Sequence, residues 1–174
     1  MGAFKATVDS VELDLGELPV IADLELHHGL TPIAVARSIE SYLLELERVF
    51  GRKPLIYSAA WFMDQCVDPS FMNKMGNDYY WIIAHYRYDT DEPFEPKLPK
   101  GLNRDRVVMH QYTDQGDAIG GSGNDMDYDR WIGTQEQWEE LVQWDDPVIP
   151  EPPTDLNLCE KVEKIWLAHP ELWE

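Results

Sequence analysis

Short apolar segments separated by one long amphipathic helix restrict this chain to a fold built on parallel strands. The segments LPVIADLEL (18–26), PLIYSA (54–59) and YYWIIAHY (79–86) each have the length and apolar content of a buried strand. Between the first two, residues 33–50 carry apolar side chains at helical spacing. This helix follows Thr31 as a cap and Pro32 at its first position, and it stops at Gly51. A strand, a helix and a second strand in this order predict a parallel βαβ unit.

The later part of the chain does not continue this alternation of strands and helices. A long surface loop rich in Pro, Asp and Lys is expected at 87–106, and strands are expected at 106–112 and 125–131 around a GGSG turn. A closing helix should start after Thr134, and residues 3–12 have the periodicity of a helix. The pattern predicts an α/β chain with a partial, irregular TIM-like β/α barrel in residues 1–145. A proline-rich linker at 146–155 and a short amphipathic C-terminal helix at 156–174 follow.

Charge excludes several classes of partner. The chain has 33 acidic and 14 basic residues and a formal net charge of −19. Nucleic-acid binding needs clustered Lys and Arg, so no nucleic-acid partner is expected, and an anionic membrane surface is disfavoured. No membrane span is expected because no apolar run approaches the roughly 18 residues required. The first residues lack a signal-peptide apolar stretch, so a soluble protein is expected. Action on a cell wall would then need phage-type or other release.

The two cysteines and two adjacent histidines give no strong metal or disulfide pattern. Cys66 and Cys159 are far apart and lack CxxC spacing, which argues against a disulfide framework or a zinc site. His27 and His28 follow the first strand, and no third ligand stands at a recognisable spacing. Loop histidines that face a substrate are therefore expected there, without a metal or an organic cofactor.

Asp23 and Glu25 are the first candidates for chemistry. Residues two apart in a strand point to one face, so these acids should project together while Ala22, Leu24 and Leu26 pack against helices. Desolvation and mutual repulsion would raise at least one pKa of such a pair. Glycoside hydrolysis needs one protonated and one ionised carboxyl group. The alternative is a strand end with two solvated acids.

A second acidic cluster, Asp125, Asp127 and Asp129, repeats the strand spacing. Together with Glu136 at its twelfth position it has the outline of a calcium-binding EF-hand loop. That loop needs glycine at its sixth position, where Arg130 stands, so the EF-hand is rejected. A solvated turn remains the other interpretation for Asp125.

In their order, these segments are similar to the glycoside hydrolase family 25 lysozymes, the Chalaropsis-type muramidases. The similar blocks are LPVIADLEL, PLIYSAAWF, YYWIIAHY, VVMHQYTDQG and GNDMDYDRWIGTQEQWEEL. The resemblance implies a peptidoglycan hydrolase that cleaves the β-1,4 bond between N-acetylmuramic acid and N-acetylglucosamine, and thereby breaks down cell wall. No cofactor is implied.

The resemblance also implies roles for individual residues. Glu25 would be the general acid, Asp23 its acidic partner on the same strand, and Asp127 the acid on the final strand that helps to shape the site. The glycan groove would be lined by Tyr57, Trp61, Trp81, Tyr86, Gln111 and Tyr112. Core packing remains the alternative for each aromatic residue, most strongly for Trp81.

Two departures from the family pattern matter. His110 stands where the family usually has tryptophan, which predicts a changed groove floor. In addition, the family's first strand, with its own aspartate, and two further βα units have no counterpart before residue 18. A barrel without them has unpaired edges, so a second chain is one source for the missing strands. An inactive fragment or cell-wall-binding remnant remains the alternative function, and a barrel hydrolase for another glycan is a third.

Overall fold

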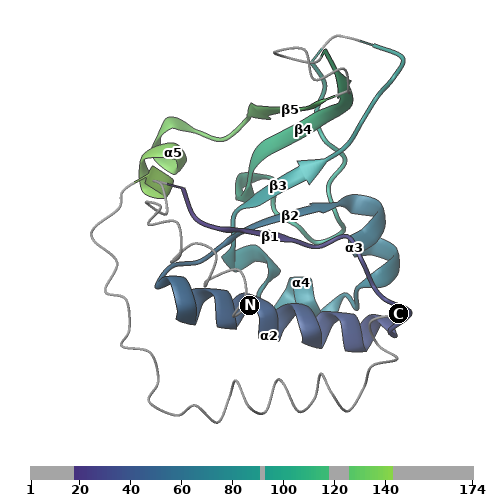
Figure 1. Ribbon diagram of the computed structural model, residues 1–174, viewed down its shortest axis with the longest axis vertical. Coiled ribbons are helices and arrows are strands. Elements are labelled where there is room, and N and C mark those ends of the chain that lie inside the picture. Colours follow the sequence, from purple (N-terminus) through teal and green to yellow (C-terminus); the bar gives the residue numbers. More distant parts are fainter. Residues whose placement is uncertain (1–17, 91–92, 118–125, 143–174) are drawn as a thin grey trace.

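The computed structural model describes residues 18–90, 93–117 and 126–142 (Figure 1). Its strands are β1 (Ile21–Asp23), β2 (Leu55–Ala59), β3 (Trp81–Ala84), β4 (Val107–Gly116) and β5 (Met126–Trp131). Its α-helices are α2 (Pro32–Phe50), α3 (Ala60–Cys66), α4 (Ser70–Lys74) and α5 (Gln135–Val142). Short 3-10 turns, η1 (Gly76–Asp78) and η2 (Arg104–Arg106), precede β3 and β4.

The strands form one open sheet in the order β1-β2-β3-β4-β5. The first four strands run parallel, and β5 pairs antiparallel to β4. The predicted βαβ start and the close pairing of the last strands are therefore confirmed, as is an α/β fold with an open sheet in place of a closed barrel. Parallel strands end at a common edge of the sheet, and that edge is where functional side chains of such folds gather.

Helix α2 follows its sequence signals closely. The Thr31 hydroxyl accepts a hydrogen bond from the Ala34 amide, Pro32 opens the helix, and Gly51 ends it in a left-handed conformation with φ of 69°. The Gly51 amide donates to the Glu47 carbonyl, which satisfies one of the last free carbonyls of the helix. The buried face of the helix consists of Val35, Ala36, Ile39, Leu43, Leu46 and Phe50.

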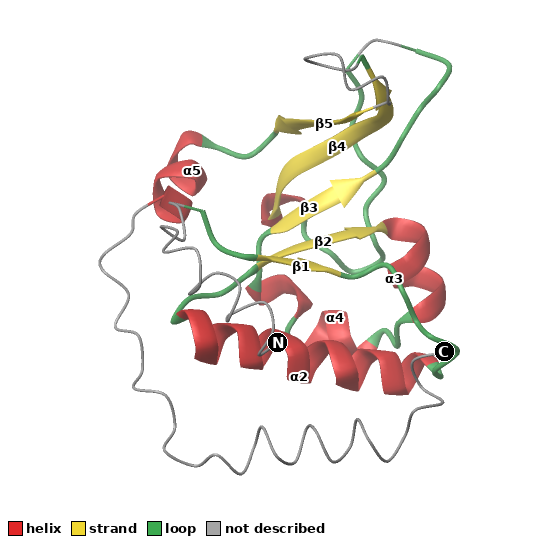
Figure 2. Cartoon of the chain, in the orientation of Figure 1, coloured by secondary structure: helices red, strands yellow, loops and turns green. Residues whose placement is uncertain are grey.

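Helices α2, α3 and α4 cover one face of the sheet (Figure 2). Alternate strand residues, such as Ala22, Ile56 and Ile83, point into the main core on that face. A smaller apolar cluster of Leu55, Ile82, Val108 and Leu141 lies on the other face. There α5, which lies near the end of the sheet where the parallel strands begin, contributes Leu141 (Figure 1).

Some boundaries differ from the sequence-based expectation. The segment expected as a strand over 18–26 is a strand only over Ile21–Asp23, and β4 runs to Gly116 instead of 112. Backbone pairing of the first segment with β2 stops at the Leu24 amide, which donates to the Tyr57 carbonyl. Because the alternation of faces ends with the pairing, Leu26 is 73% exposed, and the expectation that it packs with Ala22 and Leu24 was wrong.

The expected helix at 3–12, the turn at 120–123, the linker and the C-terminal helix lie outside the described residues. Within the described ranges, no helix is both long and apolar enough to cross a membrane.

Candidate active site

Two carboxylates stand where β1 ends. Asp23 is the last residue of the strand, and Glu25 follows two positions later. Between them, Leu24 is only 7% exposed and packs toward the helices, whereas both acids are exposed. Asp23 lies in register with Tyr57 of β2, on the face of the sheet opposite α2. The register fixes the face of Asp23 only, because Glu25 follows the last paired residue; both acids line one pocket.

The backbone between the two acids is held from β2. The Ser58 hydroxyl, which is fully buried, donates a hydrogen bond of 2.7 Å to the Leu24 carbonyl. The segment that carries Glu25 therefore keeps a fixed path although it lies beyond the last ladder hydrogen bond.

The surroundings of Glu25 favour its protonated form. Partial burial raises the pKa of the Glu25 carboxyl, and the nearby charges of Asp23 and Asp127 raise it further. A hydrogen bond with Tyr57 acts in the opposite direction. Asp127 comes from β5, so the structure brings together acids that are about a hundred positions apart in the sequence. A carboxyl group that keeps its proton to higher pH is suited to act as a general acid.

Gln111 joins two tyrosines beside these acids. Its amide oxygen accepts hydrogen bonds from the Tyr57 hydroxyl, at 2.7 Å, and from the Tyr86 hydroxyl. Gln111 is 7% exposed, so this amide is held almost out of solvent. Burial, the Tyr86 hydroxyl and the negative charges of Glu25 and Asp127 raise the pKa of Tyr57 well above its usual range, which keeps the phenol neutral. Tyr57, Tyr86 and Gln111 therefore form one connected group with Glu25.

The remaining predicted groove residues do not join this group. Trp81 is fully buried, makes an edge-to-face contact with Phe71 at 6.5 Å, and donates from its indole N–H to the Gly76 carbonyl. Of the two roles open for Trp81, the structure shows core packing. Trp61 lies on α3 and is 54% exposed. Tyr112 follows Gln111 in β4, and its ring lies beside His110 and Tyr128.

His110 does not form a groove floor. It is fully buried under the loop that follows β3, where its Nε2 lies 2.9 Å from the His85 carbonyl. Its Nδ1 lies 3.1 Å from the Arg130 guanidinium, which also donates to the Phe94 carbonyl. Since a guanidinium only donates, Nδ1 is the acceptor and Nε2 carries the proton. The expected change at this position thus affects how the loop is held against the sheet.

Sequence analysis missed Asp129 as a member of the site. This residue pairs in register with Gln111, and its carboxylate accepts a hydrogen bond from the Gln111 side chain. Partial burial raises the pKa of Asp129, and the neighbouring Asp127 adds to this. The D-x-D-x-D spacing was the available signal, but it could not say which of these acids meets Gln111. Asp125 lies outside the described residues.

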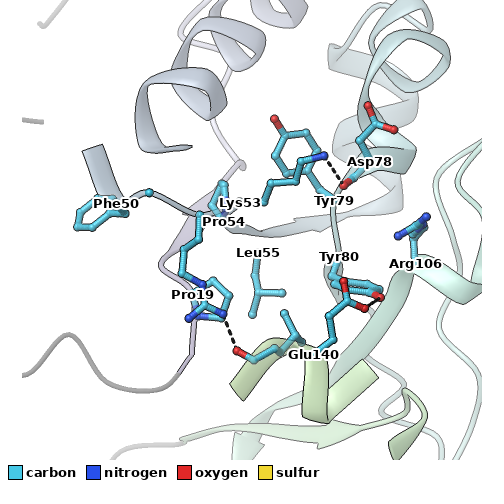
Figure 3. Close-up of a pocket in the computed structure, with 13 residues that line it drawn as sticks. Pro19, Phe50, Lys53, Pro54, Leu55, Asp78, Tyr79, Tyr80, Arg106 and Glu140 are labelled. Atoms are coloured by element: carbon cyan, nitrogen blue, oxygen red, sulfur yellow. Dashed lines mark hydrogen bonds between the residues drawn. The ribbon is translucent and has the colours of Figure 1, made fainter. Parts of the chain in front are cut away.

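Two cavities lie in different parts of the molecule, and only the smaller one is lined by the candidate carboxylates. A pocket of about 260 Å³ is lined by Asp23, Glu25, His28 and Phe62, among others. A larger one, of about 620 Å³, lies where the strands begin and contains the Tyr80–Glu140 hydrogen bond (Figure 3). The larger cavity holds none of the predicted site residues, so size does not mark the candidate site here.

Comparison with known families identifies a glycoside hydrolase family. A model of the family described as glycosyl hydrolases family 25 matches residues 2–121. The matched range contains Asp23, Glu25 and Gln111, and it ends before Asp127. The place of Asp127 beside Glu25 therefore rests on the structure.

Curated relatives are longer than this chain. It is 28% identical over 138 residues to a protein of Escherichia coli O157:H7 named "Uncharacterized protein YegX". The protein of the same name from strain K12 is 25% identical over 137 residues. Each alignment covers 78% of this chain and 44% of the relative, so the chain spans less than half the length of these relatives.

Solved structures share the fold. The spore cortex lytic enzyme SleM of Clostridium perfringens matches with a TM-score of 0.56 and 23% identity, over 71% of this chain and 40% of that enzyme. Muramidases from Acremonium alcalophilum and Trichobolus zukalii match with TM-scores of 0.55 and 0.54, both at 22% identity. These two alignments cover 74% and 72% of this chain and 57% and 56% of the muramidases. At such identities the likeness shows the fold alone.

Proposed function

Because this chain belongs to glycosyl hydrolases family 25, we propose that it hydrolyses peptidoglycan, with Glu25 as the general acid. The bond cleaved would be the β-1,4 linkage between N-acetylmuramic acid and N-acetylglucosamine. The observation that carries this proposal is the Glu25 carboxyl, whose pKa is raised by partial burial, by Asp23 at the end of β1 and by Asp127 near the start of β5.

The reaction assigns separate tasks to the carboxyl groups. Protonated Glu25 gives its proton to the glycosidic oxygen as the bond from that oxygen to the anomeric carbon breaks. Positive charge develops at the anomeric carbon, and the carboxylates of Asp23 and Asp127 stabilise it. Water then adds to this carbon and loses a proton. Asp23 can serve as nucleophile, as base or by orienting an assisting group of the sugar.

Exposure of the site fits a polymeric substrate. Asp23 and Glu25 line a pocket that opens to solvent, and Trp61, 54% exposed, offers a ring face of the kind that stacks on sugars. We propose that glycan strands of peptidoglycan bind at the pocket lined by Asp23 and Glu25, so the place of action would be the cell wall.

A direct test measures new reducing ends released from purified peptidoglycan. We expect release by the parent chain and none by Glu25→Gln. Glu139→Gln in α5 is a matched control, because Glu139 is exposed and bonds only within its own helix, to Gln135, among the contacts described. Release by a folded Glu25→Gln variant at the parent rate would refute the assignment of the acid.

The alternative function is a cell-wall-binding remnant without hydrolysis, and the open sheet favours it. The carbonyl of Val20 and the amide of Leu24 bond to β2, so the intervening backbone groups of Ile21 and Asp23 point to the outer edge of β1. Among the described residues, no strand pairs with that edge. Co-sedimentation with peptidoglycan without release of reducing ends would support this alternative.

We also propose that a second chain supplies strands to the outer edge of β1. Ile21 beside this edge is 53% exposed, and an unpaired parallel strand readily accepts another one. Light scattering with and without a longer family 25 relative tests this. A mixture that shows only the separate masses would argue against such pairing.

A further inference from the structure

Tyr88 is an exposed aromatic residue that the proposed reaction does not use. It lies in the turn after β3, two positions beyond Tyr86, and it is 66% exposed. A single exposed aromatic residue needs no functional explanation by itself. Tyr88 differs from that ordinary case because contacts with two other side chains hold its ring in place.

Both ends of the Tyr88 side chain are held. Its hydroxyl donates a hydrogen bond of 3.1 Å to the Asp114 carboxylate. Its ring makes an edge-to-face contact with the ring of Tyr86, with centroids 6.4 Å apart. The charged residues that alternate with these tyrosines, Arg87 and Asp89, pair with each other at 2.7 Å. A ring that is already fixed and still exposed loses little conformational entropy when it binds a ligand.

Asp114 reaches Tyr88 because the pairing of β4 is irregular. In a regular strand, Gln111 and Thr113 would share one face and Asp114 would point to the other. Here the pairing with β5 advances by two residues on β4, from Gln111 to Thr113, and by only one on β5. A shift of this kind re-aims the side chains that follow it. Gln111 and Asp114, although three positions apart, therefore both contact tyrosines of the segment after β3.

Tyr86 connects Tyr88 to the carboxylate site. The Tyr86 hydroxyl donates to the Gln111 amide oxygen, which also accepts from the Tyr57 hydroxyl at 2.7 Å. Tyr57 in turn lies in register with Asp23 at the end of β1. These side chains therefore form a row along the edge where the parallel strands end. In that row, Tyr88 is a neighbour of the reacting position and is separated from it by Tyr86.

We propose that Tyr88 and Asp114 form an additional sugar subsite beside the acids, which binds an uncharged pyranose ring such as N-acetylglucosamine. The exposed ring of Tyr88 stacks on the apolar face of the sugar. A carboxylate has two oxygens that accept hydrogen bonds, so Asp114 can hold Tyr88 and also accept from a hydroxyl or acetamido N–H group of the sugar. This inference rests on the proposed function, to which it adds a preference for longer glycan strands.

The charge of the subsite selects between the two sugars of peptidoglycan. N-acetylmuramic acid carries a carboxylate on its lactyl group, whereas N-acetylglucosamine is uncharged. Asp114 places a negative charge directly beside the Tyr88 ring, in a chain whose formal net charge is −19. Like charges at short range are unfavourable and disfavour the wrong ligand. The subsite should therefore prefer N-acetylglucosamine.

The test measures the Kd of tetra-N-acetylchitotetraose, an uncharged tetramer of N-acetylglucosamine, for the full chain by NMR titration. Tyr88→Ala removes the stacking ring, so the Kd should rise about tenfold, the equivalent of one good aromatic contact. Tyr88→Phe keeps the ring beside Tyr86 and should bind more tightly than Tyr88→Ala. Leu44→Ala is the control, because Leu44 is 56% exposed on α2, and its Kd should equal that of the parent. A ¹H–¹⁵N spectrum shows whether each variant is folded.

A second comparison tests the role of charge. Asp114→Asn keeps an oxygen that can accept from Tyr88 but removes the negative charge. We expect it to bind the uncharged tetramer as the parent does. It should bind a tetrasaccharide of alternating N-acetylglucosamine and N-acetylmuramic acid more tightly than the parent does. The same change for both sugars, or tighter binding of neither, would overturn the proposed selection by charge.

Failure of this inference differs from failure of the proposed function. A parent chain that does not bind the tetramer, or a Tyr88→Ala variant with the Kd of the parent, would overturn the subsite even if the chain hydrolyses peptidoglycan. A chain that releases no reducing ends, but loses tetramer binding in Tyr88→Ala, would refute the proposed function and leave the subsite standing.

Discussion

The hydrogen bond from Ser58 to Leu24 allows a sharp prediction about how the acid is held. Ser58→Ala removes a fully buried donor and leaves the Leu24 carbonyl, in a residue only 7% exposed, without this partner. An unsatisfied buried carbonyl costs about 1–3 kcal/mol. For a chain of 174 residues this corresponds to a fall in Tm of about 2–4 °C for each kcal/mol.

Two measurements on Ser58→Ala check this reasoning. Urea unfolding gives the free energy of unfolding, and the control is Ser38→Ala on the exposed face of α2, where a change within about 0.5 kcal/mol is expected. The second is the rate of peptidoglycan hydrolysis, which should fall because the Glu25 segment loses its anchor. If Ser58→Ala is no less stable than Ser38→Ala, the hydrogen bond does not hold this segment.

Four further variants probe the electrostatics and the aromatic residues. The pKa of Glu25 is raised in the folded chain, so its contribution to stability is present at acid pH and is lost as the pH rises through the folded-state pKa. Glu25→Gln should therefore be more stable than the parent at pH 7, with a difference that shrinks toward pH 4 in urea titrations. Asp23→Asn removes a charge that raises the pKa of Glu25, so the alkaline limb of the pH–rate profile should move to lower pH. An unmoved limb would show that the charge of Asp23 does not raise the pKa of Glu25. Trp81→Ala should lose about 3–5 kcal/mol of stability in denaturant titrations, whereas exposed Trp61→Ala should lose less than about 0.5 kcal/mol and instead weaken co-sedimentation with peptidoglycan.

Local signals predicted the elements that depend on local chemistry. Thr31, Pro32 and Gly51 bound α2 as expected, and apolar runs located the strands around Tyr57, Ile82 and Val108. The end of β1 was harder to predict because it depends on where pairing with β2 stops. Leu26 shows this limit: its apolar side chain continued the pattern, but no ladder hydrogen bond continued the strand.

Contacts between distant segments were the main gap. Sequence reasoning paired Asp23 with Glu25 because they lie on one strand. It had no signal for the Asp129–Gln111 hydrogen bond, which depends on the register between β4 and β5. For His110, a substitution relative to the family pattern was visible, but its burial beside Arg130 needed three-dimensional packing. The family resemblance named the residues near the acid, and the strand register placed them relative to one another.

The most direct test of the central claim identifies the sugar at the newly formed reducing end. Peptidoglycan digested by the full chain is reduced with borohydride, and the fragments are analysed by mass spectrometry. The account predicts reduced N-acetylmuramic acid at the new ends with the parent chain and none with Glu25→Gln. New ends carrying reduced N-acetylglucosamine, or identical products from the Glu25→Gln variant, would contradict it.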